Sequence, residues 1–167
     1  MTARRQENKV WLTSATVFAA VFAFLPWLAN DRAWAVSSQR VVTDRFSGLA
    51  IDGYDPVAYF TDKDARPGLP DFEASQGGAI WQFRNDRNRA IFLANPEIYG
   101  PRFGGYDPVD LARGKVVAGR PLVWRIVGQR LYLFRTPENR DAFVRDSSCL
   151  AKAMDNWPRL SATLADY

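Results

Sequence analysis

The sequence predicts an α+β fold made of two related halves, each with a β-hairpin followed by a helix. The five residues Gly-Tyr-Asp-Pro-Val occur twice, at 53–57 and 105–109. Two further segments, 83–92 and 134–143, share Phe, Arg, Asn, Arg and Phe at one spacing. The two pairs are separated by 52 and 51 positions, so one internal duplication accounts for both. Between them, each half contains two short apolar runs that flank a turn.

Each hairpin is predicted from a pair of strand-like runs around a tight turn. In the first half, residues 72–76 and 79–83 flank a Gly-Gly pair, which is typical of a two-residue hairpin turn. In the second half, residues 122–127 and 130–134 flank Gly-Gln and are rich in branched and aromatic side chains. The strands can make one small four-stranded antiparallel sheet or two facing hairpins, covered by short helices in either case.

A helix start follows each hairpin. Asn85 or Asp86 is a suitable N-cap for the first helix, which we expect to end near Ala94, before Asn-Pro. Thr136 is the expected cap of the second helix, with Pro137 at its first position.

The repeated Gly-Tyr-Asp-Pro-Val motif is interpreted first as a helix start. Asp55 and Asp107 have the side chain of an N-cap, the following proline fixes φ in the first turn, and the glycine permits an unusual turn. A functional alternative stays open, in which the two Tyr-Asp pairs meet across a pseudo-twofold axis and line one pocket. The candidate ligand-binding residues are Tyr54, Asp55, Tyr106, Asp107 and Trp81.

Trp81 is included because an aromatic ring can stack on a ligand, although packing in the core explains its position as well. Trp81 and Trp124 are expected at near-corresponding places in the two hairpins, which favours a scaffold shared by the two halves.

The first 35 residues are predicted to be a secretory signal peptide. Basic residues precede an apolar stretch that has no charge between Lys9 and Asp31, and the segment closes on Ala33-Trp34-Ala35. Because the apolar run is long enough to cross a bilayer, a retained membrane anchor is the alternative. We therefore expect export to the periplasm or secretion, with membrane contact limited to an uncleaved leader.

The remaining chain is organised around one domain. Residues 36–47 are expected to be an N-terminal extension, and residues 161–167 a C-terminal tail. The domain itself spans 48–160, with duplicated halves at about 51–103 and 103–154.

Composition restricts the chemistry. Loss of the leader would lower the formal charge from +4 to +2, so nucleic-acid binding has little support. The chain has no histidine and a single cysteine, Cys149. A nucleophilic role for Cys149 therefore lacks an imidazole base, and we interpret it as a small packing residue near the C-terminal helix. No catalytic residue is assigned.

Four segments carry a resemblance to a known family. They are AIDGYDPVAYF at 50–60, WQFRNDRNRAIFLANPEIYGPRFGGY at 81–106, GQRLYLF at 128–134 and NWPRL at 156–160. Together they resemble the bacterial exported YHS-domain proteins over about residues 48–160. The resemblance implies a small α+β domain with a loose link to metal handling, and most exported members have no assigned activity.

The chain departs from that family at its metal ligands. Many exported members carry a cysteine after the second Gly-Gly-Tyr, where this sequence has Asp107, and the family's histidine has no counterpart. A soft-metal site is therefore not transferable. We expect an exported, non-enzymatic YHS-like binding or accessory protein for a small ligand or protein partner, with no cofactor predicted and the metal content open. The alternative is a hard-metal or haem-binding protein that uses the Tyr and Asp side chains of both motifs.

Overall fold

The α+β prediction is confirmed by a computed structural model that describes residues 41–164. The predicted signal peptide, residues 36–40 of the extension and residues 165–167 of the tail lie outside the described residues. Within 41–164, no helix combines the length and apolar character that crossing a membrane requires.

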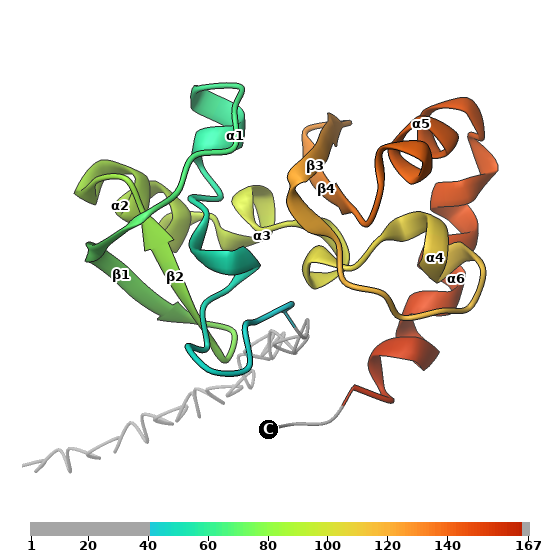
Figure 1. Ribbon diagram of the computed structural model, residues 1–167, viewed down its shortest axis with the longest axis horizontal. Coiled ribbons are helices and arrows are strands. Elements are labelled where there is room, and N and C mark those ends of the chain that lie inside the picture. The colour runs from blue at the N-terminus through green and yellow to red at the C-terminus, as the bar shows by residue number, and fades with distance from the viewer. Residues whose placement is uncertain (1–40, 165–167) are drawn as a thin grey trace, which may run out of the picture. The chain divides into compact units, whose positions relative to one another are not determined.

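The two halves contain the same elements in the same order (Figure 1). The first half consists of η1 (Ile51–Gly53), α1 (Ala58–Thr61), β1 (Leu69–Gln76), β2 (Ala79–Phe83), α2 (Asp86–Ala94) and α3 (Pro96–Tyr99). The second half consists of η2 (Arg102–Gly105), α4 (Pro108–Ala112), β3 (Arg120–Val127), β4 (Arg130–Phe134), α5 (Pro137–Arg145) and α6 (Ser148–Ser161). The last helix is the main difference, because α6 is much longer than α3.

The strands form two separate antiparallel sheets of two strands each, so the hairpins do not merge into one four-stranded sheet. Both hairpins show the same irregularity in register, between Leu69 and Glu73 in β1 and between Arg120 and Trp124 in β3. Side chains cap both following helices as expected, since Asn85 accepts a bond from the Asn88 amide and Thr136 accepts one from the Asn139 amide.

The expected correspondence of Trp81 and Trp124 is wrong. Trp81 lies in β2, the second strand of its hairpin, whereas Trp124 lies in β3, the first strand of the other. Counting from the shared Phe83 and Phe134, the residue that matches Trp81 is Tyr132. The two tryptophans therefore lie at non-equivalent positions, although both pack in the core of the first half.

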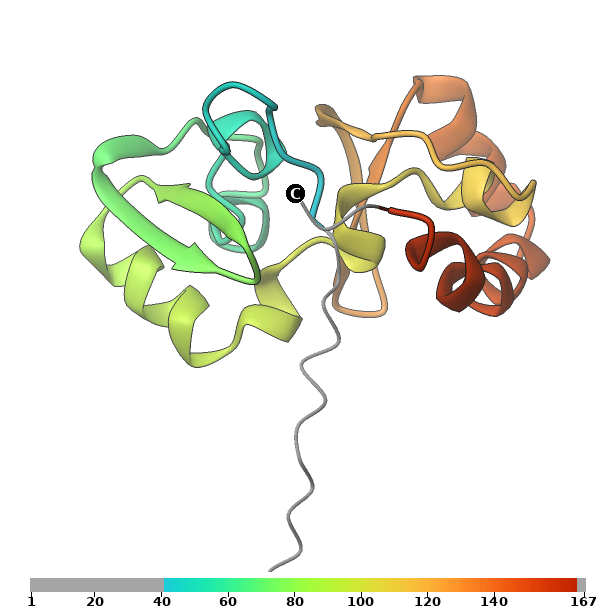
Figure 2. The ribbon, with the colours of Figure 1, turned by 90° about the horizontal axis from the view of Figure 1, so that it is seen from below.

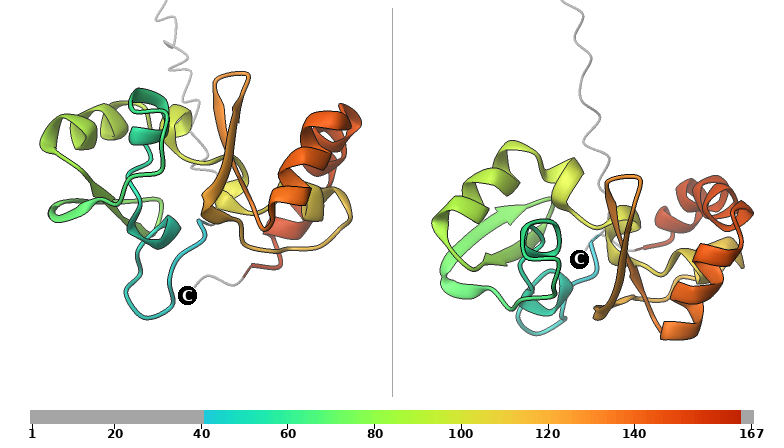
Figure 3. Two further views of the ribbon diagram at one scale, coloured as in Figure 1. Left: turned by 45° about the horizontal axis from the view of Figure 1, so that its top comes forward. Right: turned by 90° about the horizontal axis from the view of Figure 1, so that it is seen from above.

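The β3–β4 hairpin has buried side chains on both faces. Leu131 and Leu133 belong to the core of the first half, whereas Tyr132 and Phe134 belong to the core of the second. Four consecutive residues of β4 are therefore buried, as in a strand covered on both sides. Figures 2 and 3 show this hairpin between the elements of the first half and the helices α5 and α6.

Tyr59 ties the first half to this hairpin. Its side chain is fully buried, its hydroxyl donates to the carbonyl oxygen of Pro121 at 3.0 Å, and its ring meets Trp124 edge-on with centroids 5.2 Å apart. Burial, reinforced by nearby acidic groups, raises the pKa of Tyr59 far above its usual range.

We expect Tyr59→Phe to lower the free energy of unfolding by about 1 kcal/mol at neutral pH, through loss of the bond to Pro121. The pKa of Tyr59 is higher in the folded than in the unfolded protein, so the unfolded state loses its proton first and the native protein loses stability above about pH 10. Tyr59→Phe should reduce that alkaline loss, which urea unfolding from about pH 9 to about pH 11 would measure. An unchanged alkaline slope would contradict the assignment.

Candidate functional site

Asp55 is fully buried, and both of its carboxylate oxygens accept hydrogen bonds. Oδ1 accepts from the amides of Val57 at 2.8 Å and Ala58 at 3.3 Å, at the start of α1. Oδ2 accepts from the amide of Arg84 at 2.8 Å and from Nδ2 of Asn88 at 2.6 Å. One carboxylate therefore joins a helix start, the end of a hairpin and the next helix.

Asp107 repeats this arrangement in the second half. Its Oδ1 accepts from the amides of Val109 at 2.8 Å and Asp110 at 3.4 Å. Its Oδ2 accepts from the amide of Arg135 at 2.6 Å and from Nδ2 of Asn139 at 2.8 Å. The predicted cap is confirmed, and the bonds to the hairpin and to the asparagine extend it. The sequence contained a signal for these longer bonds, because the asparagine recurs at 88 and 139.

The glycine of each motif also has a structural explanation. Gly53 and Gly105 have φ of 76° and 93°, in the region that glycine tolerates best. A Cβ on Gly53 would lie 2.8 Å from Oε1 of Gln82, the far end of a flexible side chain that can move, so the positive φ is the main reason for glycine here.

The other candidate residues occupy scaffold positions. Trp81 is 3% exposed, its indole N–H donates to the Gln76 carbonyl, and its ring packs on Phe92. Tyr54 and Tyr106 are half-buried, and the Tyr106 ring packs against Trp157.

The two motifs do not meet in one site through the hydrogen bonds of their aspartates. Among the described residues, each carboxylate bonds within its own half. Residues 41–164 also contain no group of three or more His, Cys, Asp or Glu side chains placed to hold a metal ion.

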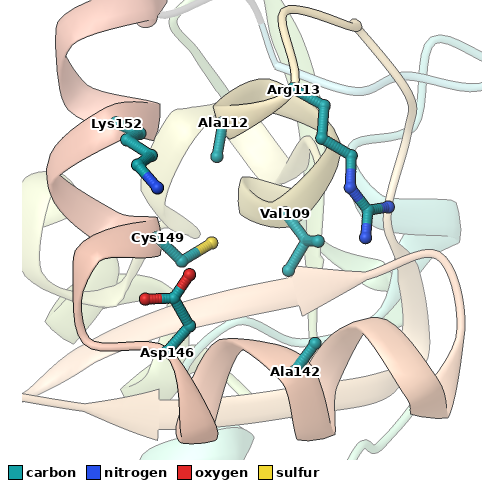
Figure 4. A pocket seen from close by; sticks show the side chains of 7 residues that line it. All are labelled: Val109, Ala112, Arg113, Ala142, Asp146, Cys149 and Lys152. Carbon is teal, nitrogen blue, oxygen red and sulfur yellow. The ribbon is translucent and has the colours of Figure 1, made fainter.

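A pocket of about 260 Å³ lies in the second half, between α4, α5 and α6 (Figure 4). It is lined by Val109, Ala112, Arg113, Ala142, Asp146, Cys149 and Lys152. Three of these side chains are aliphatic, one is a thiol and three are charged. The sequence predicted a packing role for Cys149 but not the pocket that Cys149 lines.

The charged residues come from different elements. Arg113 follows α4 and Lys152 belongs to α6, and Figure 4 shows them on opposite sides of the pocket. Asp146 precedes α6, where its Oδ1 accepts from the Ser148 amide at 2.9 Å and hydroxyl at 2.7 Å. These bonds hold the pKa of Asp146 below its usual value, so it is anionic at neutral pH.

Cys149 brings a protonated thiol into the pocket. It is 4% exposed, and its sulfur lies 3.8 Å from the carbonyl oxygen of Pro108. Burial raises the pKa of the thiol, and the charges of Asp146 and Asp107 raise it further, against the opposing effect of Arg113 and Lys152. Because the thiolate is the nucleophilic form, this environment does not activate Cys149.

Comparison of the two halves shows why space is open here. Ala112 lies five residues after Asp107, and the residue five positions after Asp55 is Phe60. Likewise, Ala142 lies three residues after Asn139, where the first half has Ile91 after Asn88. Two large apolar side chains of the first half thus correspond to two alanines in the lining of the pocket.

The larger side chains of the first half are used in packing. Phe60 meets the ring of Tyr99 edge-on, with centroids 5.2 Å apart, and both rings pack against the first core. Ile91 packs against the same core.

A second depression, of about 720 Å³, lies along β3 and α5. It is lined by Arg125, Arg140, Asp141, Val144 and Arg145. Arg140 pairs with Asp141 at 3.2 Å, and both side chains are substantially exposed. Because it is rich in arginine and lies outside the first pocket, this basic surface is a suitable control for non-specific anion binding.

We expect Asp107→Asn and Asp55→Asn each to lower the free energy of unfolding by about 3 kcal/mol, because the new NH₂ group would face N–H donors inside the protein. Urea unfolding measures this loss. Asp110→Asn is the control, since Asp110 is less buried and receives a bond from Asn139 at 3.2 Å; it should cost less than about 1 kcal/mol. Equal losses at positions 107 and 110 would contradict the role given to Asp107.

We expect Cys149 to react slowly with iodoacetamide at neutral pH, because its raised pKa keeps the thiolate scarce. Asp146→Asn should shift the dependence of the rate on pH toward lower pH, and Lys152→Gln should shift it toward higher pH. Mass spectrometry of the alkylated protein gives the rates. Shifts in the same direction for both variants would contradict the electrostatic explanation.

Comparison with known proteins finds no relative of this chain. No protein-family model, no curated protein and no solved structure matches the chain. The two halves of the chain can be compared with each other. The buried aspartates and the hydrogen bonds that they accept occur in both halves, whereas the residues at the pocket positions differ.

Proposed function

We propose that this protein is an exported, non-enzymatic binding or accessory protein related to the YHS-domain proteins, and that it holds a small ligand in the pocket of its second half. The observation that carries the proposal is the pair of alanines, Ala112 and Ala142, in the places of Phe60 and Ile91. Export rests on the leader-like residues 1–35, and the family relation rests on the four sequence segments quoted above.

Unfilled space at these two positions favours a pocket that binds a ligand over a packing defect. Phe60 and Ile91 are partly buried, so replacing each by alanine would cost less than the about 2–5 kcal/mol typical of fully buried sites, part of it through the cavity that remains. A fold that already fills the corresponding positions in its first half has a simple way to avoid that cost. Charged residues at the opening further distinguish this pocket from an apolar void.

A non-enzymatic role is supported by the state of the reactive groups. The carboxylates of Asp55 and Asp107 are buried acceptors for N–H donors, and the Cys149 thiol has a raised pKa. The chain also has no histidine to serve as a base.

The hard-metal or haem alternative gains no support from this geometry. A cation on Asp55 or Asp107 would have to displace the N–H donors that now occupy both oxygens. Those donors would then be buried without acceptors, at a cost of about 1–3 kcal/mol each. We therefore propose no second function.

Filling the pocket should abolish ligand retention. We expect Ala112→Phe combined with Ala142→Ile to remain folded, because the same pair of residues is accommodated in the first half. The native protein, dialysed against a small-molecule extract of its source cells, should retain a compound that the filled variant does not. Mass spectrometry of the denatured samples identifies it.

Arg125→Gln is the control, because it alters the second depression and leaves the pocket intact. It should retain the compound. Identical small-molecule content in the native protein and the filled variant would refute a binding function for this pocket.

A further inference from the structure

The side chains at the opening of the pocket favour an anionic ligand. Lys152 has no hydrogen bond or ion pair among residues 41–164, although its charge influences Asp146 and Cys149. The contact of Arg113 is a long one, with Nη1 3.5 Å from Oδ1 of Asp110, and its side chain is 58% exposed. A guanidinium has five N–H donors, so most of those of Arg113 remain available.

The carboxylate in the lining of the pocket, that of Asp146, already accepts hydrogen bonds. Asp146 receives two hydrogen bonds from Ser148, which fix its carboxylate at the start of α6. The lining therefore carries two cations and one carboxylate, and the carboxylate of Asp110, outside the lining, lies 3.5 Å from Arg113. The cations come from separate elements, α4 and α6, and Figure 4 shows the pocket between them.

The charged residues of the pocket and its open space both belong to the second half of the chain. Counting from the motif aspartates, the position of Arg113 corresponds to Thr61 in the first half, and counting from the asparagines, that of Asp146 corresponds to Asn95. The half that keeps Phe60 and Ile91 has neutral residues at both positions. One cation, Arg113, and the open space therefore occur in the same half, as expected for one ligand that needs both.

The side chains inside the pocket indicate the chemistry of the uncharged part of the ligand. Val109, Ala112 and Ala142 provide an aliphatic surface, and the protonated thiol of Cys149 adds no charge. A volume of about 260 Å³ has room for a molecule of a few carbon atoms. Apolar contact on one side and cationic donors on the other are the features that small-ligand sites combine.

We propose that the pocket binds a short aliphatic carboxylate, with its alkyl part against Val109, Ala112 and Ala142 and its carboxylate between Arg113 and Lys152. This inference rests on the proposed binding function and specifies the ligand class. Charge-assisted hydrogen bonds from Arg and Lys to a carboxylate are among the strong polar contacts in proteins, so the two cations determine the selectivity.

Titration of the ¹⁵N-labelled full chain with butyrate, butyramide and butylammonium tests the class. The three probes share an alkyl chain and differ in charge. Butyrate should shift the amide signals of residues 109–113 and 149–152, with an affinity at least about tenfold above that of butyramide. Arg113→Gln and Lys152→Gln should each weaken butyrate about tenfold and leave butyramide unchanged, and Ala112→Phe should abolish both.

Arg125→Gln separates specific from non-specific binding and should leave butyrate binding unchanged. Butyramide binding as tightly as butyrate would overturn the anionic class and leave the binding function standing. Loss of butyrate binding in Arg125→Gln, with Arg113→Gln unaffected, would assign the anion to the second depression and overturn the proposal. If none of the three probes shifts the signals of the pocket, both the ligand class and this pocket as a short-chain site are refuted.

Discussion

The structure depends on a buried carboxylate that is used twice. Asp55 and Asp107 each receive N–H donors from a helix start, a hairpin end and an asparagine of the next helix. A buried charge is costly unless it is paired or fully hydrogen-bonded, and here main-chain and amide dipoles supply the compensation. The segments that provide these donors are then fixed relative to one another. This explains why the spacing from aspartate to asparagine, 33 residues in one half and 32 in the other, is nearly constant.

The duplicated scaffold carries two unequal halves. Trp124 and Leu133 pack against the core of the first half, but their counterparts on the first hairpin, Glu73 and Gln82, hydrogen-bond to each other at 2.7 Å. The second hairpin therefore serves both cores, and the first hairpin serves one. The first hairpin carries a polar pair where the second hairpin carries an apolar one. The second hairpin therefore packs against the first core, whereas the first hairpin does not pack in the same way against the second core.

The differences between the two halves also distinguish the structural residues from the residues of the pocket. The residues that repeat, including both aspartates and both asparagines, have structural roles inside the protein. The residues that line the pocket are those in which the halves differ, such as Ala112 against Phe60 and Arg113 against Thr61. The two halves can differ in this way because the first core and the shared hairpin remain packed.

The local features could be predicted from the order of residues alone: both hairpins, both capped helices and the helix-start role of each Gly-Tyr-Asp-Pro-Val motif. These depend on residues a few positions apart, such as Asp107 and the amide of Val109, so their chemistry is visible in the chain. Three features depend on how the elements pack: Trp81 lies in the core, β4 is buried on both faces, and a pocket opens beside Cys149. A pocket is the space left between α4, α5 and α6, and its shape depends on how segments about forty residues apart pack together.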